Sequence, residues 1–95
     1  MPLFVLTCLD KPGNLELRMK TRPAHLDFIA ANRAMVRLAG PFLDAEGGMA
    51  GSMLIVETES LAQAQAFADG DPYKTAGVFE SSVVRPFKLT IGELA

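Results

Sequence analysis

The sequence has no tryptophan and only one tyrosine, one histidine and one cysteine among its 95 residues. A lone cysteine, Cys8, cannot form an intrachain disulfide, and the chain has no C-x-x-C or Cys/His grouping typical of structural zinc. The glycines fit no phosphate-loop pattern, and the acidic residues have no calcium-loop spacing. We therefore expect a protein of a reducing compartment, with no metal site and no cofactor.

Positive charge is scarce and scattered. The formal net charge is −2, and no run of lysine or arginine supplies the attraction on which nucleic-acid binding depends. The apolar start "MPLFVLTCL" lacks the basic segment and cleavage site of a signal peptide, and "GMAGSMLIVE" is far shorter than the roughly 20 residues that span a bilayer. We expect a cytoplasmic protein with no nucleic-acid or membrane partner.

Hydrophobic residues are plentiful, at 49% of the chain. A chain of this length predicts one domain, residues 1–95, which buries roughly 60–65% of the surface of its unfolded form. The core of such a domain is thin. Apolar surface that the chain cannot bury by itself requires another cover.

Alternation, capping and turn signals predict a β-α-β-β-α-β order, the ferredoxin-like arrangement of an α+β protein. It has a four-stranded antiparallel sheet with two helices on one face. Ser60 and Gln63 form an S-x-x-Q capping box for the second helix. We expect strands over 2–9, 34–42, 52–58 and 78–89, and helices over 15–33 and 60–70 followed by a short turn at 71–77.

Three details of these elements are also predicted. Pro23 predicts a kink or a break in the first helix, whose core stripe contains Leu26, Ile29 and Ala30. Gly40 and Pro41 predict the end of the second strand, and Pro86 predicts an edge position, a bulge or the end of the last strand.

The first and third strands are apolar on both faces. Two helices cover only one face of a four-stranded sheet, so the other face is left without a cover from the chain itself. We expect a homodimer in which this open face packs against the same face of a second copy.

A group of basic side chains lies on one flank of the first predicted helix. Arg18, Arg22, His25 and Ile29 follow one another at spacings of four, three and four. These residues by themselves favour a solvated flank rather than a functional site. In a solvated flank, the arginine stems cover apolar surface. Both interpretations remain open at this point.

Three further polar residues have both an ordinary and a functional interpretation. Asp71 precedes Pro72 and is expected to cap a short helical turn, and a carboxylate held in this way is well placed to orient an imidazole. His25 lies 46 positions away (71 − 25), so spacing does not decide whether the two meet. Ser52 is either a hairpin residue or a ligand contact, and Tyr73 either packs or donates its hydroxyl to a ligand.

Four stretches of the chain, taken in order, resemble the YciI-like (YCII-related) family. "RMKTRPAHL" matches the family's first-helix signature, and "LAGP" matches its second strand ending. "GSMLIVE" matches its third strand, and "DPYKTAGVFESSVVRPFK" its aspartate–proline–tyrosine turn and final strand. The resemblance implies a dimeric α+β barrel with facing sheets. It also implies a His25–Asp71 dyad in a cleft that Arg18, Arg22 and Ser52 line.

The resemblance changes the balance in favour of a functional His25. At least one branch of the family is associated with dehydrochlorination of a chlorinated hydroxyquinol. We therefore expect a cofactor-independent enzyme of the lyase, isomerase or dehydrochlorinase type that acts on a small oxygenated cyclic or aromatic metabolite. In it, His25 is the general base or acid, Asp71 orients it, and the substrate contacts are Arg18, Arg22, Ser52 and Tyr73. The alternatives are a non-catalytic dimeric module that binds a small ligand, and a dimeric scaffold without a site.

Overall fold

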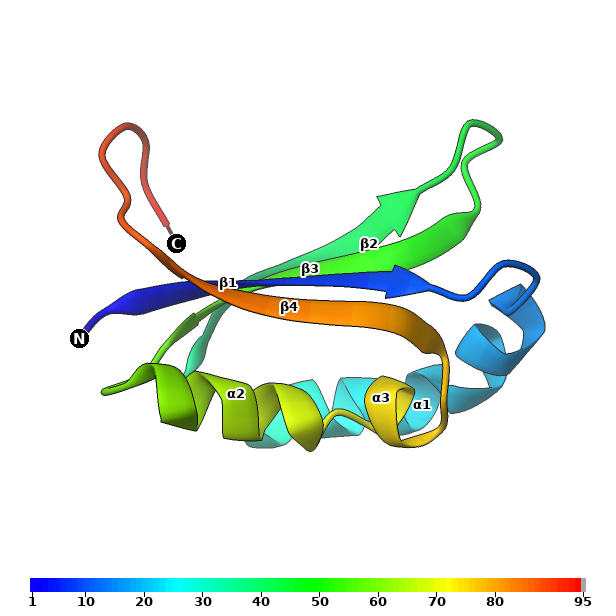
Figure 1. Ribbon diagram of the computed structural model, residues 1–95, viewed down its shortest axis with the longest axis horizontal. Coiled ribbons are helices and arrows are strands. Elements are labelled where there is room, and N and C mark those ends of the chain that lie inside the picture. Colours follow the sequence, from blue (N-terminus) through cyan, green and yellow to red (C-terminus); the bar gives the residue numbers. More distant parts are fainter. Residues whose placement is uncertain (95) are drawn as a thin grey trace.

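One antiparallel sheet lies over one layer of helices in the computed structural model, which describes residues 1–94 (Figure 1). Residue 95, the last of the predicted domain 1–95, lies outside the described residues. The predicted β-α-β-β-α-β order is confirmed, with the short turn after the second helix present as a third helix, α3. The elements are β1 (Leu3–Asp10), α1 (Leu15–Ala31), β2 (Val36–Leu43), β3 (Met49–Glu57), α2 (Leu61–Asp69), α3 (Pro72–Thr75) and β4 (Phe79–Phe87).

The strand order in the sheet is β2-β3-β1-β4, which is the ferredoxin-like topology. The edge strands β2 and β4 each contain a proline, Pro41 and Pro86. The edge position predicted from Pro86 is therefore confirmed. The expectation that Gly40 and Pro41 end the second strand is wrong, because β2 continues to Leu43. An edge strand tolerates proline since half of its backbone N–H groups point away from the sheet.

The core lies between the sheet and the helices. It combines apolar side chains of the two central strands with one face of α2. Ser60 caps α2 as predicted, because its side chain accepts a hydrogen bond from the Gln63 amide. The buried core residues of these three elements include Phe4, Leu6, Leu54, Val56, Ala64, Phe67 and Ala68.

The first helix differs from its prediction at Pro23. Of the kink or break predicted there, the break is wrong, because α1 is one α-helix from Leu15 to Ala31. Proline removes the hydrogen bond to the carbonyl of Met19, four residues earlier. Both residues are exposed, so water can take the place of the missing donor. This continuity keeps Arg18 and His25 on the same face of one helix.

Within the described part of the chain, no helix or strand covers the face of the sheet opposite the helices, on whose side the C-terminal segment curls back (Figure 1). The strand pairing places Val5 and Leu9 of β1 on this face beside Met53 of β3 and Val83 of β4. Leu9 is 48% exposed and Val83 39%. Among residues 1–94, no helix has the length and apolar character needed to cross a membrane.

Candidate active site

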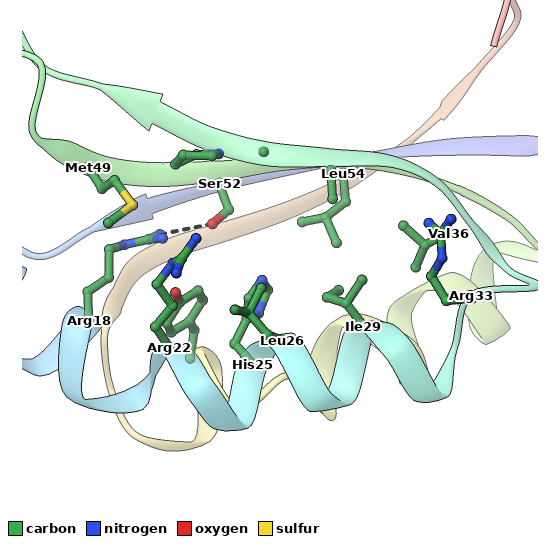
Figure 2. A pocket seen from close by; sticks show the side chains of 14 residues that line it. Arg18, Arg22, His25, Leu26, Ile29, Arg33, Val36, Met49, Ser52 and Leu54 are labelled. Carbon is green, nitrogen blue, oxygen red and sulfur yellow. Dashed lines mark hydrogen bonds between the residues drawn. The ribbon is translucent and has the colours of Figure 1, made fainter. Parts of the chain in front are cut away.

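A cleft with a cavity of about 250 Å³ lies between α1 and the strands β2 and β3 (Figure 2). The helix faces the sheet here with polar side chains. The core stripe predicted for α1 is wrong at Leu26, which is 46% exposed, and at Ala30, which is exposed, whereas Ile29 is half-buried and packs against the core as predicted. The buried residues of α1 are Arg18 and His25, which are 2% and 8% exposed, so the solvated-flank interpretation is wrong for these two.

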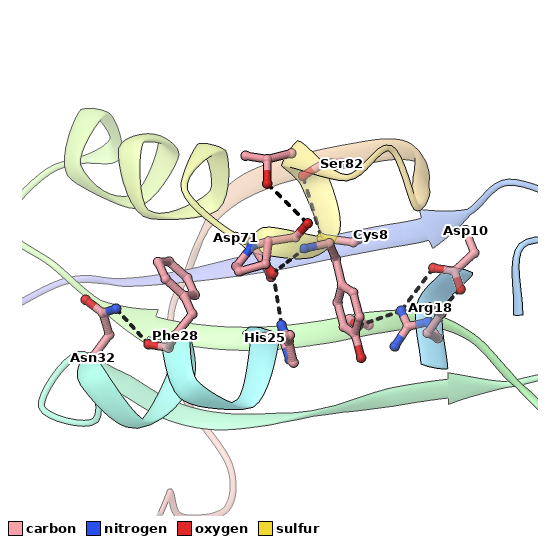
Figure 3. Close-up of polar contacts among 12 residues, drawn as sticks. Cys8, Asp10, Arg18, His25, Phe28, Asn32, Asp71 and Ser82 are labelled. Atoms are coloured by element: carbon pink, nitrogen blue, oxygen red, sulfur yellow. Dashed lines mark hydrogen bonds and ion pairs between the residues drawn. The ribbon is translucent and has the colours of Figure 1, made fainter. Parts of the chain in front are cut away.

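The structure brings His25 and Asp71 into contact. The Nδ1 atom of His25 lies 2.9 Å from Oδ1 of Asp71, and both side chains are buried (Figure 3). A carboxylate only accepts hydrogen bonds, so Nδ1 carries a proton and Nε2 is left for other chemistry. The imidazole points from α1 into the cleft (Figure 2).

The Asp71 carboxylate is held in place by the start of α3. As predicted, Asp71 is the N-cap, and the same Oδ1 that contacts His25 accepts a hydrogen bond from the Tyr73 amide at 2.9 Å. Pro72 fills the first helical position, where no backbone donor is needed. The local sequence D-P-Y therefore fixes the carboxylate that orients the imidazole.

Tyr73 packs against both basic residues that α1 buries. Its ring stacks on the His25 ring with the centroids 4.1 Å apart, and the Arg18 guanidinium lies 4.3 Å from its centroid. Positions 18 and 25 are about 10.5 Å apart along a helix axis, so the ring fills the space between the two side chains. Burial raises the pKa of the Tyr73 hydroxyl, against the opposing effect of Arg18 and Arg22. The hydroxyl therefore stays protonated at neutral pH and can donate a hydrogen bond.

Arg18 is tied to two other residues. Its Nε and one terminal nitrogen donate to the Asp10 carboxylate at 2.6 and 2.9 Å, and the same terminal nitrogen donates to the Ser52 hydroxyl at 2.9 Å (Figure 3 for Asp10, Figure 2 for Ser52). Burial lowers the pKa of Arg18, but the hydrogen bonds and charge of Asp10 outweigh it and raise this pKa above its ordinary value. Because the Ser52 oxygen accepts from Arg18, its hydroxyl proton is free to point at a ligand.

All six residues singled out in the sequence gather here. Arg18, Arg22, His25, Ser52 and Tyr73 line the cleft, and Asp71 lies behind His25. Sequence reasoning did not identify Asp10, which ends β1 and has no spacing signal toward Arg18. It also did not identify Arg33, which follows α1 and lines the far end of the cleft.

The residues that line the cleft carry positive charge without a carboxylate among them. Arg22 and Arg33 make no ion pair with the residues that the structure describes, whereas Arg18 pairs with Asp10. An anionic ligand is therefore favoured. Within residues 1–94, no three side chains of the His, Cys, Asp and Glu types group in a way that could hold a metal ion.

The fold and the site define a ferredoxin-like α+β protein with an arginine-lined cleft and a buried imidazole–carboxylate pair. The sequence model of the YCII-related domain matches residues 2–88, and the chain belongs to this family. Protein YciI of Escherichia coli O6:H1 is 44% identical over 94 residues, which cover 90% of this chain and 96% of that protein. An uncharacterized protein of Haemophilus influenzae is 36% identical over 93 residues, with 90% and 95% covered.

One solved structure is similar in both fold and sequence. It is the 5-chloro-2-hydroxyhydroquinone dehydrochlorinase TftG from Burkholderia phenoliruptrix AC1100, in complex with 2,5-dihydroxybenzoquinone. Its TM-score is 0.85 at 34% sequence identity, and the match covers 90% of this chain and 93% of that one. The predicted family and fold are therefore confirmed.

Proposed function

We propose that this protein is a cofactor-independent enzyme of the lyase, isomerase or dehydrochlorinase type, which uses His25 for acid–base chemistry on a small oxygenated cyclic or aromatic metabolite. The observation that carries the proposal is the contact of His25 Nδ1 with the buried Asp71 carboxylate, at the wall of a cleft lined by arginine. The contact leaves Nε2 available to take a proton from a bound ligand.

The proposed reaction begins when Nε2 removes a proton from a hydroxyl group, or from a carbon next to a carbonyl group. The electron pair released moves into the ring, and the negative charge that develops on oxygen is stabilised by Arg22 and by the hydroxyl groups of Ser52 and Tyr73. Asp71 stabilises the imidazolium that forms. The proton then returns to another carbon in an isomerisation, or leaves with the departing group in an elimination.

The relative TftG suggests a first substrate class, chlorinated hydroxyquinols. In their dehydrochlorination, one hydroxyl proton moves by way of the base to the ring carbon that bears chlorine, and a second hydroxyl proton is taken up by the base. Two hydroxyl groups thereby become the carbonyl groups of a quinone, and chloride departs with the electrons of its bond to carbon. No oxidant is consumed. A cavity of about 250 Å³ suits a small substrate of this kind.

The test is release of chloride from 5-chloro-2-hydroxyhydroquinone by the purified protein without oxygen. We expect His25→Ala and His25→Gln to lower kcat by at least about 100-fold with an unchanged circular dichroism spectrum. Lys20→Gln, an exposed change on the same helix, should retain full activity. Unchanged turnover in both His25 variants would exclude the proposed role. Binding of 2,5-dihydroxybenzoquinone without turnover of any hydroxyquinol would favour the non-catalytic ligand-binding module.

We also propose that the protein is a homodimer whose open sheet faces pack together. The support is the uncovered apolar face, on which Leu9 and Val83 are 48% and 39% exposed. Val83→Glu should convert the dimer to a monomer in light scattering, because it places a charge in the contact. Leu61→Glu, at an equally exposed position at the start of α2, should remain a dimer. A wild-type monomer at micromolar concentration would contradict the proposal.

We propose the cytoplasm as its compartment. The support is Cys8, a free thiol that β1 buries, since free cysteines persist in reducing surroundings. Cell fractionation tests this, and recovery of the protein from an oxidising compartment would refute it.

A further inference from the structure

The cleft has two positively charged ends. Arg22 lies near Ser52 at one end, and Arg33 lies beside Val36 at the other, with His25 between them along α1 (Figure 2). From Arg22 to Ala31, the last residue of α1 and two before Arg33, the helix extends about 13.5 Å, so the two arginines lie at separate places along the cleft. Only the end with Arg22 contains the groups that the proposed reaction uses.

The space between these ends is apolar. Leu26 and Ile29 line it from the helix, and Val36 and Leu54 line it from the strands. From His25 to Ala31, the last residue of α1, the helix extends about 9 Å. A ligand whose reacting ring lies at His25 would therefore need an arm along this apolar stretch to reach Arg33.

Arg33, like Arg22, differs from Arg18 and Arg37 in making no ion pair with the residues that the structure describes. Arg18 pairs with Asp10, and Arg37 pairs with Glu57 at 2.8 Å. Among the residues that the structure describes, Arg33 has no acidic partner, and its exposed side chain lines the open cleft. A guanidinium in this position matches the geometry of a carboxylate, which accepts two parallel hydrogen bonds from it.

We propose that Arg33 forms a second anion-binding subsite, so that the ligand has an oxygenated ring at one end and a carboxylate at the end of a short apolar arm. This inference rests on the proposed function, because the ring is placed at His25 as the reacting part. Leu26 and Ile29 contact the arm, and Arg33 holds the carboxylate.

The test is calorimetric binding of three phenols with arms of increasing length: 4-hydroxybenzoate, 4-hydroxyphenylacetate and 3-(4-hydroxyphenyl)propanoate. Each acid is compared with its uncharged primary amide, so the ratio of the two affinities isolates the carboxylate. We expect this ratio to increase with arm length and to reach about fivefold for the propanoate. Arg33→Gln should return the ratio to about one, and Lys20→Gln should leave it unchanged.

The outcomes separate this inference from the proposed function. If the wild type binds 2,5-dihydroxybenzoquinone but shows no preference for the acids, the Arg33 subsite is refuted and the proposed function is not. The Arg33 subsite is also refuted if the preference for the acid over the amide survives Arg33→Gln but is lost in Arg22→Gln. In that case the carboxylate lies at the Arg22 end of the cleft. If the wild type binds none of the probes, both proposals fail.

Discussion

Replacing Asp71 tests the contact on which the candidate site depends. One oxygen of Asp71 accepts both the Tyr73 amide, which caps α3, and Nδ1 of His25. Asp71→Ala removes the acceptor of both hydrogen bonds. Loss of an N-cap costs about 1 kcal/mol, and a buried donor left without a partner costs about 1–3 kcal/mol. We therefore expect the free energy of unfolding to fall by about 2–4 kcal/mol.

Asp71→Asn separates the charge from the acceptor. Both hydrogen bonds go to the same carboxylate oxygen, so the single oxygen of an asparagine can accept both. Asparagine caps helices about as well as aspartate. Only the charge is lost, and because charged hydrogen bonds are stronger than neutral ones, we expect a loss of about 1 kcal/mol. The proposed activity should fall much further than the stability, since no carboxylate remains to stabilise the imidazolium.

Urea unfolding followed by circular dichroism, at one fixed protein concentration, measures these differences. The ¹⁵N shifts of the imidazole show separately whether Nδ1 carries the proton. Asp27→Ala, an exposed aspartate inside α1, is the control and should leave the stability nearly unchanged. A loss below about 0.5 kcal/mol for Asp71→Ala, or equal losses for the two Asp71 variants, would refute the shared-acceptor reasoning.

Three further predictions concern the protein around the site. A methyl group at Gly51 would lie 2.5 Å from the backbone oxygen of Cys8, so Gly51→Ala should lower the urea midpoint by the equivalent of about 1–3 kcal/mol. In Gly40→Ala the new methyl group meets no atom within 4 Å, so the midpoint should be unchanged. Equal midpoint shifts for Gly51→Ala and Gly40→Ala would contradict this reasoning. Burial raises the pKa of the Cys8 thiol. The buried thiol therefore stabilises the fold fully below its unfolded-state pKa of about 8.5, and this stabilisation is lost as the pH rises further. In urea titrations at alkaline pH, Cys8→Ala should lose less stability than the wild type. Arg18→Met leaves the Asp10 carboxylate buried without a partner and should lower the free energy of unfolding by about 3–5 kcal/mol. Adding Asp10→Leu should restore most of this loss, and a double variant as unstable as Arg18→Met would refute the prediction.

Local signals were sufficient for most of the fold and for the caps. Capping depends on neighbouring residues, so Ser60 and Asp71 were recognised as N-caps from the sequence. The errors arose where burial decides the outcome. Pro23 was expected to kink or break the helix. The break does not occur, because a lost hydrogen bond costs less where water reaches the freed carbonyl. The predicted stripe failed at Leu26 because this residue lies at the cleft, whereas Ile29 packs against the core.

The sequence alone determined the order of strands and helices, the family and the six residues that gather at the cleft, because periodicity, capping and motif spacing are properties of neighbouring positions. The tertiary structure alone decided that Tyr73 lies between Arg18 and His25 and that Arg33 faces the far end of the cleft. It also supplied the contact of His25 with Asp71, which spacing left open and only the family resemblance implied. These contacts join positions far apart in the chain. Their distances depend on the register of the sheet and on how α1 and α3 pack against it, and no local pattern encodes either.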